Sequence, residues 1–500
     1  MTKLTMLPAF LLPISFALLA LVPLASAAPP PPPSSGGASA AGASGTPAAD
    51  DWTALGKEVT QEIAARQFDK VAARFDSTMA AVLSPAKLGA TWDAVLAQAG
   101  PLRAVAGARH ERAGTFDVVY VTCQFERLTL DVKLAFDARR HIAGMFFVPS
   151  TAAPAAAAAP TWTPPAYAAP AAFHERQVTV GSAPWELPGT LTLPNGAARC
   201  PVVILVHGSG PEDQDETIGP NKPFKDLAWG LASRGVAVLR YTKRTAQYAA
   251  QLKLADGTFT VREETVDDAR AAVALAARQP EIDGRRIFVL GHSLGGTLAP
   301  RIAANIVNTA NGPQAPRVAG IVLMGGGTRT LQRTIVEQLE HIASLDPQGP
   351  NAAEMSRMIE KARLAARTID SPELTPTSKV DVLGATIPGS YFLDLRDYHP
   401  AQAAARLGIP ILVLQAARDY QSNGADLDGW RQALANDPRA TFHEYPGLYH
   451  LFMPSSTPGT GLGSPADYST PGHVVEAVIR DVAAWIAAVP GPAPDRGGRS

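Results

Sequence analysis

From about residue 172 onward, apolar residues fall in short continuous runs, separated by stretches with helical spacing. The run from Val202 to Val206 is the clearest, and such runs predict strands that are covered on both faces. Their alternation with helical stretches, such as residues 262–278, predicts an α/β fold with a mostly parallel, doubly wound sheet that starts with an antiparallel hairpin. Eight strands are predicted, at residues 175–181, 187–194, 201–206, 236–240, 286–290, 318–324, 409–415 and 440–445.

The pattern differs in the first part of the chain, over residues 51–148. Apolar positions in 52–99 follow a helical spacing. After this stretch the period changes to two, as in 116–121, and further strands are predicted near 128–136 and 141–148. Helices followed by an antiparallel sheet predict a separate small α+β domain.

The chain begins with the layout of an export signal. Lys3 precedes an apolar run over residues 7–24, and Ala25-Ser26-Ala27 is a small-residue cleavage pattern. We therefore expect a signal peptide over 1–27 and a secreted or periplasmic protein, without stable membrane insertion once the signal is cleaved. An uncleaved anchor is the alternative, and the prolines inside the apolar run argue against it.

Segments rich in small residues and proline divide the rest of the chain. Residues 28–50 are rich in Pro, Ser, Gly and Ala, and residues 149–171 are rich in Ala and Pro and have no charged residue. Such segments cannot bury enough apolar surface to fold. We expect linkers at both places, a disordered tail at 490–500, and a large domain over 172–489.

Composition excludes several classes of protein. Hydrophobic residues make up 46% of the chain, which is enough for large cores, and the net charge of −1 gives no electrostatic case for a nucleic-acid partner. Two cysteines are too few for a disulfide framework or a four-cysteine zinc site. Cys123 and Cys200 either pair or stay as two separately buried thiols, and we favour separate thiols. The histidine spacing predicts no metal site, and the triple glycine at 325–327 lacks the pattern of a dinucleotide fingerprint, so no cofactor is expected.

One motif points to nucleophilic chemistry. Gly291-His292-Ser293-Leu294-Gly295 follows the predicted strand at 286–290 and precedes a predicted helix. A strand, a tight G-x-S-x-G turn and a helix together form a nucleophile elbow, in which glycines allow the close approach of neighbouring backbone. We therefore predict Ser293 as a nucleophile, with an ordinary glycine turn as the alternative. Pro300 is expected to bend the helix.

A serine nucleophile needs a base and a carboxylate that orients the base. In this architecture the chain order is Ser, then Asp or Glu, then His. Asp419 follows the strand that ends near 415, and His450 follows the strand that ends at 445. Both are expected in loops at the edge of the sheet where ligands bind.

Other acidic residues and histidines fit these roles less well. Asp426 and Asp428 lie where a helix begins, so a solvated or capping role is expected for them. His443 falls inside a strand, and His473 opens the last helix.

The tetrahedral intermediate of acyl transfer also needs donors for its oxyanion. The backbone N–H of Leu294 is one candidate, because it directly follows the nucleophile. The second is predicted to be the backbone N–H of Ser209, in the glycine-rich loop at 207–211. Structural roles are expected for the side chains of His207 and Ser209.

Residues 325–408 are too long for a plain crossover between two strands. Helical patterns at 331–345 and 352–368 predict a cap over the active site, with scaffold helices beside the sheet as the alternative. Aromatic residues of this stretch are candidates for the pocket wall or for the core: Tyr391, Phe392 and Tyr398.

These motifs resemble the α/β-hydrolase superfamily, and above all its exported bacterial esterase-like and serine-aminopeptidase-like members. The resemblance rests on HGSGPEDQD at 207–215, VLRYTKR at 238–244, GHSLGGTLAPRIA at 291–303, PILVLQAARDYQ at 410–421 and YPGLYHLFM at 445–453. It implies an eight-stranded hydrolase sheet with a helical cap, and Ser293, Asp419 and His450 as nucleophile, acid and base. The chain departs from the family at Thr242, where Asp is usual, and at Tyr449, where Asn is usual.

The small domain resembles a domain of unknown function with an NTF2-like fold that often precedes exported hydrolases. The resemblance rests on FDKVAARFDSTMAAVLSPAKLGATWDAVLAQAGPL and HIAGMFFVP, which carry no catalytic motif. Two roles of this domain are compatible with the sequence: it binds a ligand, or it contributes only to folding and stability.

Together these features predict an exported serine hydrolase that acts on a small-molecule carboxylic ester through an acyl-enzyme. A peptidase or amidase with the same triad is the first alternative, because the triad does not reveal the leaving group. A non-catalytic ligand-binding protein that retained the fold is the second, since a fold alone does not establish activity. The sequence leaves the acyl preference and the oligomeric state open.

Overall fold

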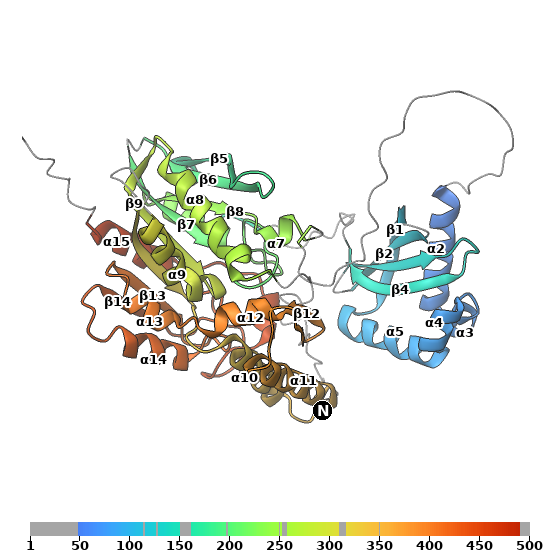
Figure 1. The fold of residues 1–500 in the computed structure, drawn as a ribbon. Coiled ribbons are helices and arrows are strands. Elements are labelled where there is room, and N and C mark those ends of the chain that lie inside the picture. Colours follow the sequence, from blue (N-terminus) through green and yellow to red (C-terminus); the bar gives the residue numbers. More distant parts are fainter. Residues whose placement is uncertain are drawn as a thin grey trace, which may run out of the picture. The chain divides into compact units, whose positions relative to one another are not determined.

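The chain forms two compact units, each of which is described by itself (Figure 1). The predicted signal peptide at 1–27, almost all of the first linker and almost all of the tail lie outside the described residues. The computed structural model describes residues 49–113, 116–126, 129–150, 162–196, 199–249, 251–252, 258–309, 317–349 and 351–490.

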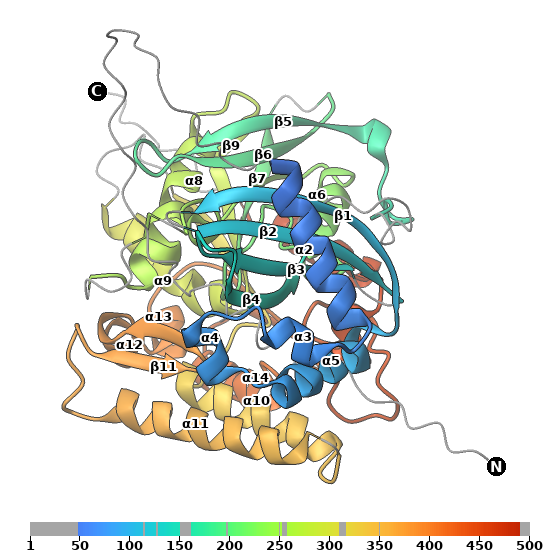
Figure 2. The same cartoon turned by 90° about the vertical axis from the view of Figure 1, so that its right-hand side faces the viewer.

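The small unit combines helices with a four-stranded antiparallel sheet of order β1-β2-β3-β4 (Figure 2). Its core lies between the long helices and the sheet, where Ile63 and Trp92 are buried against Val121 and Phe136. The elements are α2 (Ala49–Ala64), α3 (Phe68–Ala72), α4 (Ser77–Val82), α5 (Pro85–Ala99), β1 (Leu102–Ala113), β2 (Phe116–Phe125), β3 (Thr129–Phe136) and β4 (Ile142–Pro149).

Two details of the small unit differ from the elements that the apolar periodicity predicts. The helical stretch is divided into α2 to α5, because Asp76 and Ser84 each accept a backbone N–H and thereby start a new helix. Strand β1 was not predicted from the sequence. Its register shifts twice against β2, between Leu102 and Ala104 and between Val105 and Gly107, and such bulges remove the two-residue period.

The large unit contains the predicted eight-stranded sheet, in the order β14-β13-β10-β9-β7-β8-β6-β5. The pairs β5–β6 and β6–β8 are antiparallel and the other pairs are parallel. This confirms the predicted fold class, including the hairpin at the start. The strands are β5 (Phe173–Val180), β6 (Leu187–Pro194), β7 (Cys200–Val206), β8 (Ala237–Tyr241), β9 (Ile282–His292), β10 (Val318–Met324), β13 (Ile411–Ala416) and β14 (Ala440–Tyr445).

The strand order reverses at β7, and this reversal positions the site. From β7 the chain passes through α6 to β8 on one side, and then through α8 to β9 on the other side. Because parallel crossovers are right-handed, α6 and α8 lie on opposite faces of the sheet. The loops that follow β7 and β9 therefore separate at the carboxyl edge and leave a crevice there. The helices are α6 (Pro223–Ala232), α7 (Arg244–Gln247), α8 (Asp267–Ala277), α9 (Leu294–Thr309), α14 (Gly424–Ala433) and α15 (Glu476–Ala488), with a π-helical turn at Arg262–Val266 and short 3-10 helices at Pro170–Ala172 and Pro465–Ser469.

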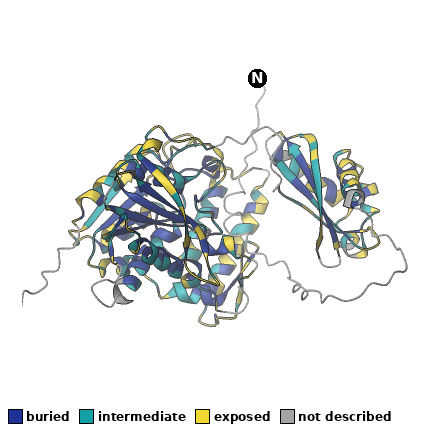
Figure 3. Ribbon diagram, turned by 90° about the horizontal axis from the view of Figure 1, so that it is seen from above, coloured by how far each residue is buried: buried dark blue, intermediate teal, exposed yellow. Residues whose placement is uncertain are grey.

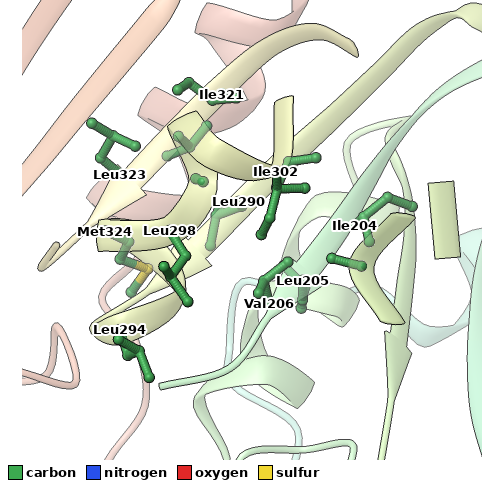
Figure 4. Close-up of a cluster of buried hydrophobic side chains, with 14 of the residues drawn as sticks. Ile204, Leu205, Val206, Leu290, Leu294, Leu298, Ile302, Ile321, Leu323 and Met324 are labelled. Atoms are coloured by element: carbon green, nitrogen blue, oxygen red, sulfur yellow. The ribbon is translucent and has the colours of Figure 1, made fainter. Parts of the chain in front are cut away.

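The core of the large unit lies along the central strands, which Figure 3 shows mostly as buried. Side chains of α9, such as Leu298 and Ile302, meet those of β7, β9 and β10 (Figure 4). Continuous burial on both sheet faces explains why these strands carry uninterrupted apolar runs.

An insertion follows β10 and lies to one side of the sheet in both views (Figures 1 and 2). Its last helix, α13, packs against α9 and α14 as a crossover helix does, so this end of the stretch predicted as a cap belongs to the scaffold. The β11–β12 hairpin was not predicted, because its turn places Leu383 and Gly384 at positive φ and leucine is not a residue typical of such turns. The elements are α10 (Leu331–Leu345), α11 (Ala352–Asp370), β11 (Lys379–Val382), β12 (Ala385–Pro388), α12 (Gly389–Arg396) and α13 (Pro400–Ala405).

The last part of the predicted second linker, from residue 162, packs on the large unit. Trp162 Nε1 donates a hydrogen bond to the buried Asp226 at 2.8 Å, and its ring lies edge-on to Trp229, with ring centres 4.9 Å apart. The Tyr167 hydroxyl donates to the Val474 carbonyl at 2.7 Å. Composition did not reveal this docking, because two aromatic residues in a run of alanine and proline are enough to anchor it.

Both cysteines are free and buried, Cys123 in β2 and Cys200 at the start of β7. This agrees with the favoured prediction of two separate thiols. Within the described part of the chain, no helix is long and apolar enough to cross a membrane.

Candidate active site

Ser293 occupies a sharp turn between β9 and α9, as the motif predicts. Its φ of +55° is in the left-handed region that non-glycine residues rarely adopt, and its N–H donates to the Met324 carbonyl at 3.0 Å. The flanking glycines are required sterically. A methyl group at Gly291 would lie 2.0 Å from the Gly295 carbonyl oxygen, and one at Gly295 would lie 2.2 Å from the Val206 carbonyl oxygen.

The structure brings Asp419 and His450 together from different loops. His450 Nδ1–H donates to Asp419 Oδ2 at 2.5 Å. Asp419 is fully buried, and its other oxygen accepts the N–H groups of Gln421 at 2.7 Å and Ser422 at 3.0 Å. These bonds fix the carboxylate, and they leave His450 Nε2 as the ring nitrogen that can take up a proton.

Gly325 lies directly after β10 and beside this pair. A methyl group there would lie at ordinary contact distance, 3.4 Å from His450 Nδ1 and 3.6 Å from Asp419 Oδ2, but its φ of +60° is one that L side chains rarely adopt. The backbone conformation at Gly325 therefore favours glycine beside the two side chains.

A cavity of about 220 Å³ receives the predicted residues from several loops. Ser293 and His450 both line it, and so do Ser209 and Leu294, whose amides were predicted as oxyanion donors. Among the described residues, neither of these amides has a hydrogen-bond partner. One cavity is therefore lined by the predicted nucleophile, the predicted base and the two residues whose amides were predicted as oxyanion donors.

The insertion supplies much of the cavity wall, as expected for a cap. Leu331 and Ile335 of α10 line it, together with the three aromatic residues named as pocket candidates. Two of these are fixed by hydrogen bonds: the Tyr391 hydroxyl donates to Glu264 at 2.7 Å and the Tyr398 hydroxyl donates to the Thr297 carbonyl at 2.7 Å.

The alternative acids and bases lie elsewhere. Asp426 is fully buried instead of solvated, because it accepts the N–H groups of Thr328 and Arg329 and the Arg329 guanidinium. It thus fixes the start of the insertion. Asp428 is exposed, His443 faces Asp481 at 3.4 Å, and His473 contacts Asp226 at 2.9 Å.

A buried charge pair that sequence reasoning missed supports the elbow. Glu216 Oε1 accepts the Gly208 N–H at 2.8 Å, and Glu216 Oε2 lies 2.9 Å from His292 Nδ1. The other nitrogen of His292 donates to the His450 carbonyl at 3.0 Å. Glu216 and His292 therefore connect the loop after β7 with the backbone of His450.

The pKa values of Glu216 and His292 shift in opposite directions. Burial alone would raise the pKa of Glu216, but the neighbouring His292 outweighs it and lowers the pKa below its ordinary range. Burial alone would lower the pKa of His292, but Glu216 raises it above its ordinary value. The contribution of Glu216 to stability is lost as the pH falls through its lowered pKa. The contribution of His292 is lost as the pH rises through its raised pKa.

We therefore expect His292→Gln to destabilise the protein by about 3 kcal/mol near pH 6, because it leaves the Glu216 carboxylate buried without a counter-charge. The loss should shrink in acid, where burial without a counter-charge lets Glu216 of the variant take up a proton, and in alkali, above the raised pKa of wild-type His292. Urea unfolding at pH 4, 6 and 9 measures it, with His443→Gln as the control for a more exposed histidine beside a carboxylate. A loss that is equal at all three pH values would contradict the ionic role.

The comparison with known protein families decides the identity of the large unit. The model of the alpha/beta hydrolase family matches residues 203–461, which include Ser293, Asp419 and His450. The chain belongs to the alpha/beta hydrolase family. The hydrolase also matches, over residues 56–145, a protein family of unknown function, DUF3887.

The hydrolase is 33% identical to Esterase EstD of Thermotoga maritima over 426 residues, which cover 85% of this chain and 93% of that protein. Because this alignment is longer than the large unit, it also takes in part of the small one. Among solved structures, Est1E from Butyrivibrio proteoclasticus is 16% identical and covers 62% of this chain and 99% of its own, with a TM-score of 0.39. The esterase of Pyrobaculum calidifontis is 17% identical over 63% of this chain and 87% of its own, with a TM-score of 0.37.

The described residues of the hydrolase contain no group of three or more His, Cys, Asp or Glu side chains that could hold a metal ion. The functional features that sequence reasoning missed are Glu216, His292 and Gly325. A partial signal was present for two of them, since acidic residues recur in the loop after β7 and a triple glycine follows β10. Neither pattern shows which side chain it will meet.

Proposed function

We propose that the chain is an exported serine hydrolase that cleaves carboxylic esters through an acyl-enzyme. The observation that carries this proposal is the buried Asp419–His450 pair beside the cavity that Ser293 also lines. The similarity to a protein named as an esterase supports the ester as substrate class.

In the first half of the reaction, Ser293 Oγ attacks the ester carbonyl while His450 Nε2 takes its proton. Asp419, which accepts from Nδ1, stabilises the imidazolium that forms. The carbonyl oxygen becomes negative and is held by the N–H groups of Ser209 and Leu294. One such donor contributes about 3 to 4 kcal/mol to the transition state.

The intermediate then collapses and the alcohol leaves, with the proton from His450. In the second half, His450 takes a proton from water, and the hydroxyl attacks the acyl-Ser293 carbonyl through a second tetrahedral intermediate. The acid leaves and the free serine is restored. Both halves use the same base and the same donors, because both take place in the cavity that Ser293 and His450 line.

The cavity wall favours an apolar acyl or alcohol group. Ile335, Ile387 and Phe392 line it. Three charged side chains in the described lining have partners: Glu264 pairs with Lys243, Arg329 pairs with Asp426, and Arg396 donates to the Ile369 and Ser371 carbonyls. A cationic substrate would lose its hydration there without gaining an unpaired carboxylate.

The proposal includes export of the enzyme from the cytoplasm. The apolar segment at 7–24 and the cleavage pattern that ends at Ala27 support a secreted or periplasmic enzyme. Amino-terminal sequencing of the protein recovered outside the cytoplasm tests it, with a mature chain that begins at Ala28 as the expected result. A recovered chain that still begins at Met1 would contradict cleavage.

A substrate panel tests the chemistry. A fluorophosphonate probe should label Ser293, and p-nitrophenyl acyl esters should be hydrolysed with kcat/KM at least about 100-fold above that of matched aminoacyl amides. Preference for the amides would instead identify a peptidase or amidase. A folded protein that neither reacts with the probe nor turns over any substrate would favour a ligand-binding protein.

A further inference from the structure

The loop after β7 is held at Gly208 from two sides. The Gly208 N–H donates to Glu216, as described above, and the Gly208 carbonyl accepts a hydrogen bond from Lys243 Nζ at 2.7 Å. Lys243 follows β8, and it is almost fully buried, with a relative exposure of 2%. A lysine ammonium group in the interior is costly, so its position requires an explanation.

The Gly208 carbonyl and the Ser209 N–H belong to the same peptide group. In a trans peptide these two bonds lie in one plane and point in opposite directions. A bond that fixes the carbonyl oxygen therefore also fixes the direction of the Ser209 N–H. Ser209 and Ser293 both line the cavity, and a methyl group at Gly208 would lie 3.6 Å from Ser293 Oγ, so this peptide adjoins the nucleophile.

We infer that Lys243 is a positioning residue for the oxyanion hole: its ammonium group fixes the Gly208–Ser209 peptide so that the Ser209 N–H faces the oxygen on which charge develops. This role presupposes the acyl-enzyme reaction proposed above. A cation on the carbonyl oxygen also polarises the peptide and strengthens its N–H as a donor. Lys243 thus acts on the transition state without touching the substrate.

The same lysine connects the oxyanion loop to the insertion. Lys243 Nζ also donates to Glu264 Oε1 at 2.5 Å, and Glu264 Oε2 accepts the Tyr391 hydroxyl at 2.7 Å. Tyr391 belongs to α12 and lines the cavity. A continuous path of hydrogen bonds therefore runs from the substrate-facing wall, through Glu264 and Lys243, to the peptide that carries the Ser209 amide.

A contribution to stability is a weak explanation for the buried pair of Lys243 and Glu264. Replacing a buried ion pair by apolar side chains of similar volume is often neutral or stabilising. The neighbouring pair of Arg244 and Asp268 is also buried but makes no hydrogen bond to Gly208 within the described part of the chain, so it offers a matched comparison. If Lys243 acted only through folding, substitution of either cation would have the same kinetic effect.

The test compares Lys243→Met with Arg244→Met in the full chain, using p-nitrophenyl acyl esters. We expect Lys243→Met to lower kcat by about 10- to 100-fold with KM changed less than threefold, because it disturbs the direction of one oxyanion donor. Arg244→Met should keep kcat of the folded protein within about twofold of wild type, even where its melting temperature falls.

A thionoester substrate separates positioning from general damage. Sulfur is a weaker hydrogen-bond acceptor than oxygen, so a well-directed oxyanion hole favours the oxygen ester. The ratio of kcat for ester over thionoester should shrink about tenfold in Lys243→Met and stay at the wild-type value in Arg244→Met. An unchanged ratio in Lys243→Met would overturn the positioning role.

If Lys243→Met does not fold, the double variant Lys243→Met/Glu264→Gln removes the same bond to Gly208 without leaving a buried charge. A wild-type kcat in this double variant would overturn the role, and a kcat and ester ratio as low as those expected above would support it. Absence of esterase activity in the wild type would instead refute the proposed function. The two failures are therefore distinguishable.

Discussion

Replacing Ser293 by alanine is expected to lower kcat for p-nitrophenyl acyl esters by about 10⁶-fold, because the variant lacks the attacking oxygen. Labelling by a fluorophosphonate probe should disappear as well. Folding should be nearly unaffected: serine already places a Cβ at this positive-φ position, so alanine adds no steric strain and the stability should change by less than about 1 kcal/mol.

Ser356→Ala is the matched control for this substitution. Ser356 is an exposed serine of α11, and its hydroxyl donates to the Ala352 carbonyl within the same helix. Activity and labelling should both stay at the wild-type level there. Retained turnover in folded Ser293→Ala would remove Ser293 from the mechanism and with it the acyl-enzyme.

The second large effect is expected at Gly295, on structural grounds. A methyl group at this position would lie 2.2 Å from the Val206 carbonyl oxygen and 2.6 Å from that of His207. No side chain can rotate away to relieve this contact, because both atoms belong to the backbone. Gly295→Ala must therefore move the end of β7 away from the start of α9.

This displacement should have two consequences. The free energy of unfolding should fall by about 3 kcal/mol or more, as in severe overpacking. The kcat of the folded fraction should fall about 100-fold, because the Ser209 and Leu294 amides lie on the two segments that are pushed apart. Urea unfolding and ester hydrolysis measure the two effects.

Gly284→Ala provides the comparison. Gly284 lies in β9, the strand that leads into the elbow, and the nearest atom to a new methyl group is the Ala277 carbonyl oxygen at 3.8 Å. Its stability should stay within about 1 kcal/mol of wild type. Equal losses in the two variants would mean that the tight contact at the elbow is not what constrains Gly295.

The elements that could be predicted are those whose burial is uniform along the chain. The central strands of the large sheet are covered on both faces, so their apolar runs marked them, and their alternation with helices predicted a mostly parallel sheet. Strand β1 escaped prediction because two bulges break its period. The β11–β12 hairpin escaped because Leu383 adopts a positive φ that only its surroundings impose.

The residues of the candidate site also fall into those that the sequence could place and those that it could not. Asp419 and His450 could be placed because each follows a strand of the sheet, and the carboxyl ends of parallel strands meet at one edge. The partners of Glu216 and Lys243 could not, because each lies in a connecting segment whose path is set by tertiary packing. A charged residue in a loop is usually solvated, and only the folded chain shows that these two are buried.

The docking of Trp162 and Tyr167 determines how the contribution of the small unit can be measured. The described part of the large unit already packs from residue 162, although the chain around it has the composition of a linker. A fragment that starts at 172 would lack both anchors and would expose the face of Trp229 to water. It would also deprive the buried Asp226 of its indole donor. A loss of activity in that fragment would report damaged packing of the enzyme itself, whereas a fragment that starts at 162 isolates the effect of the missing small unit.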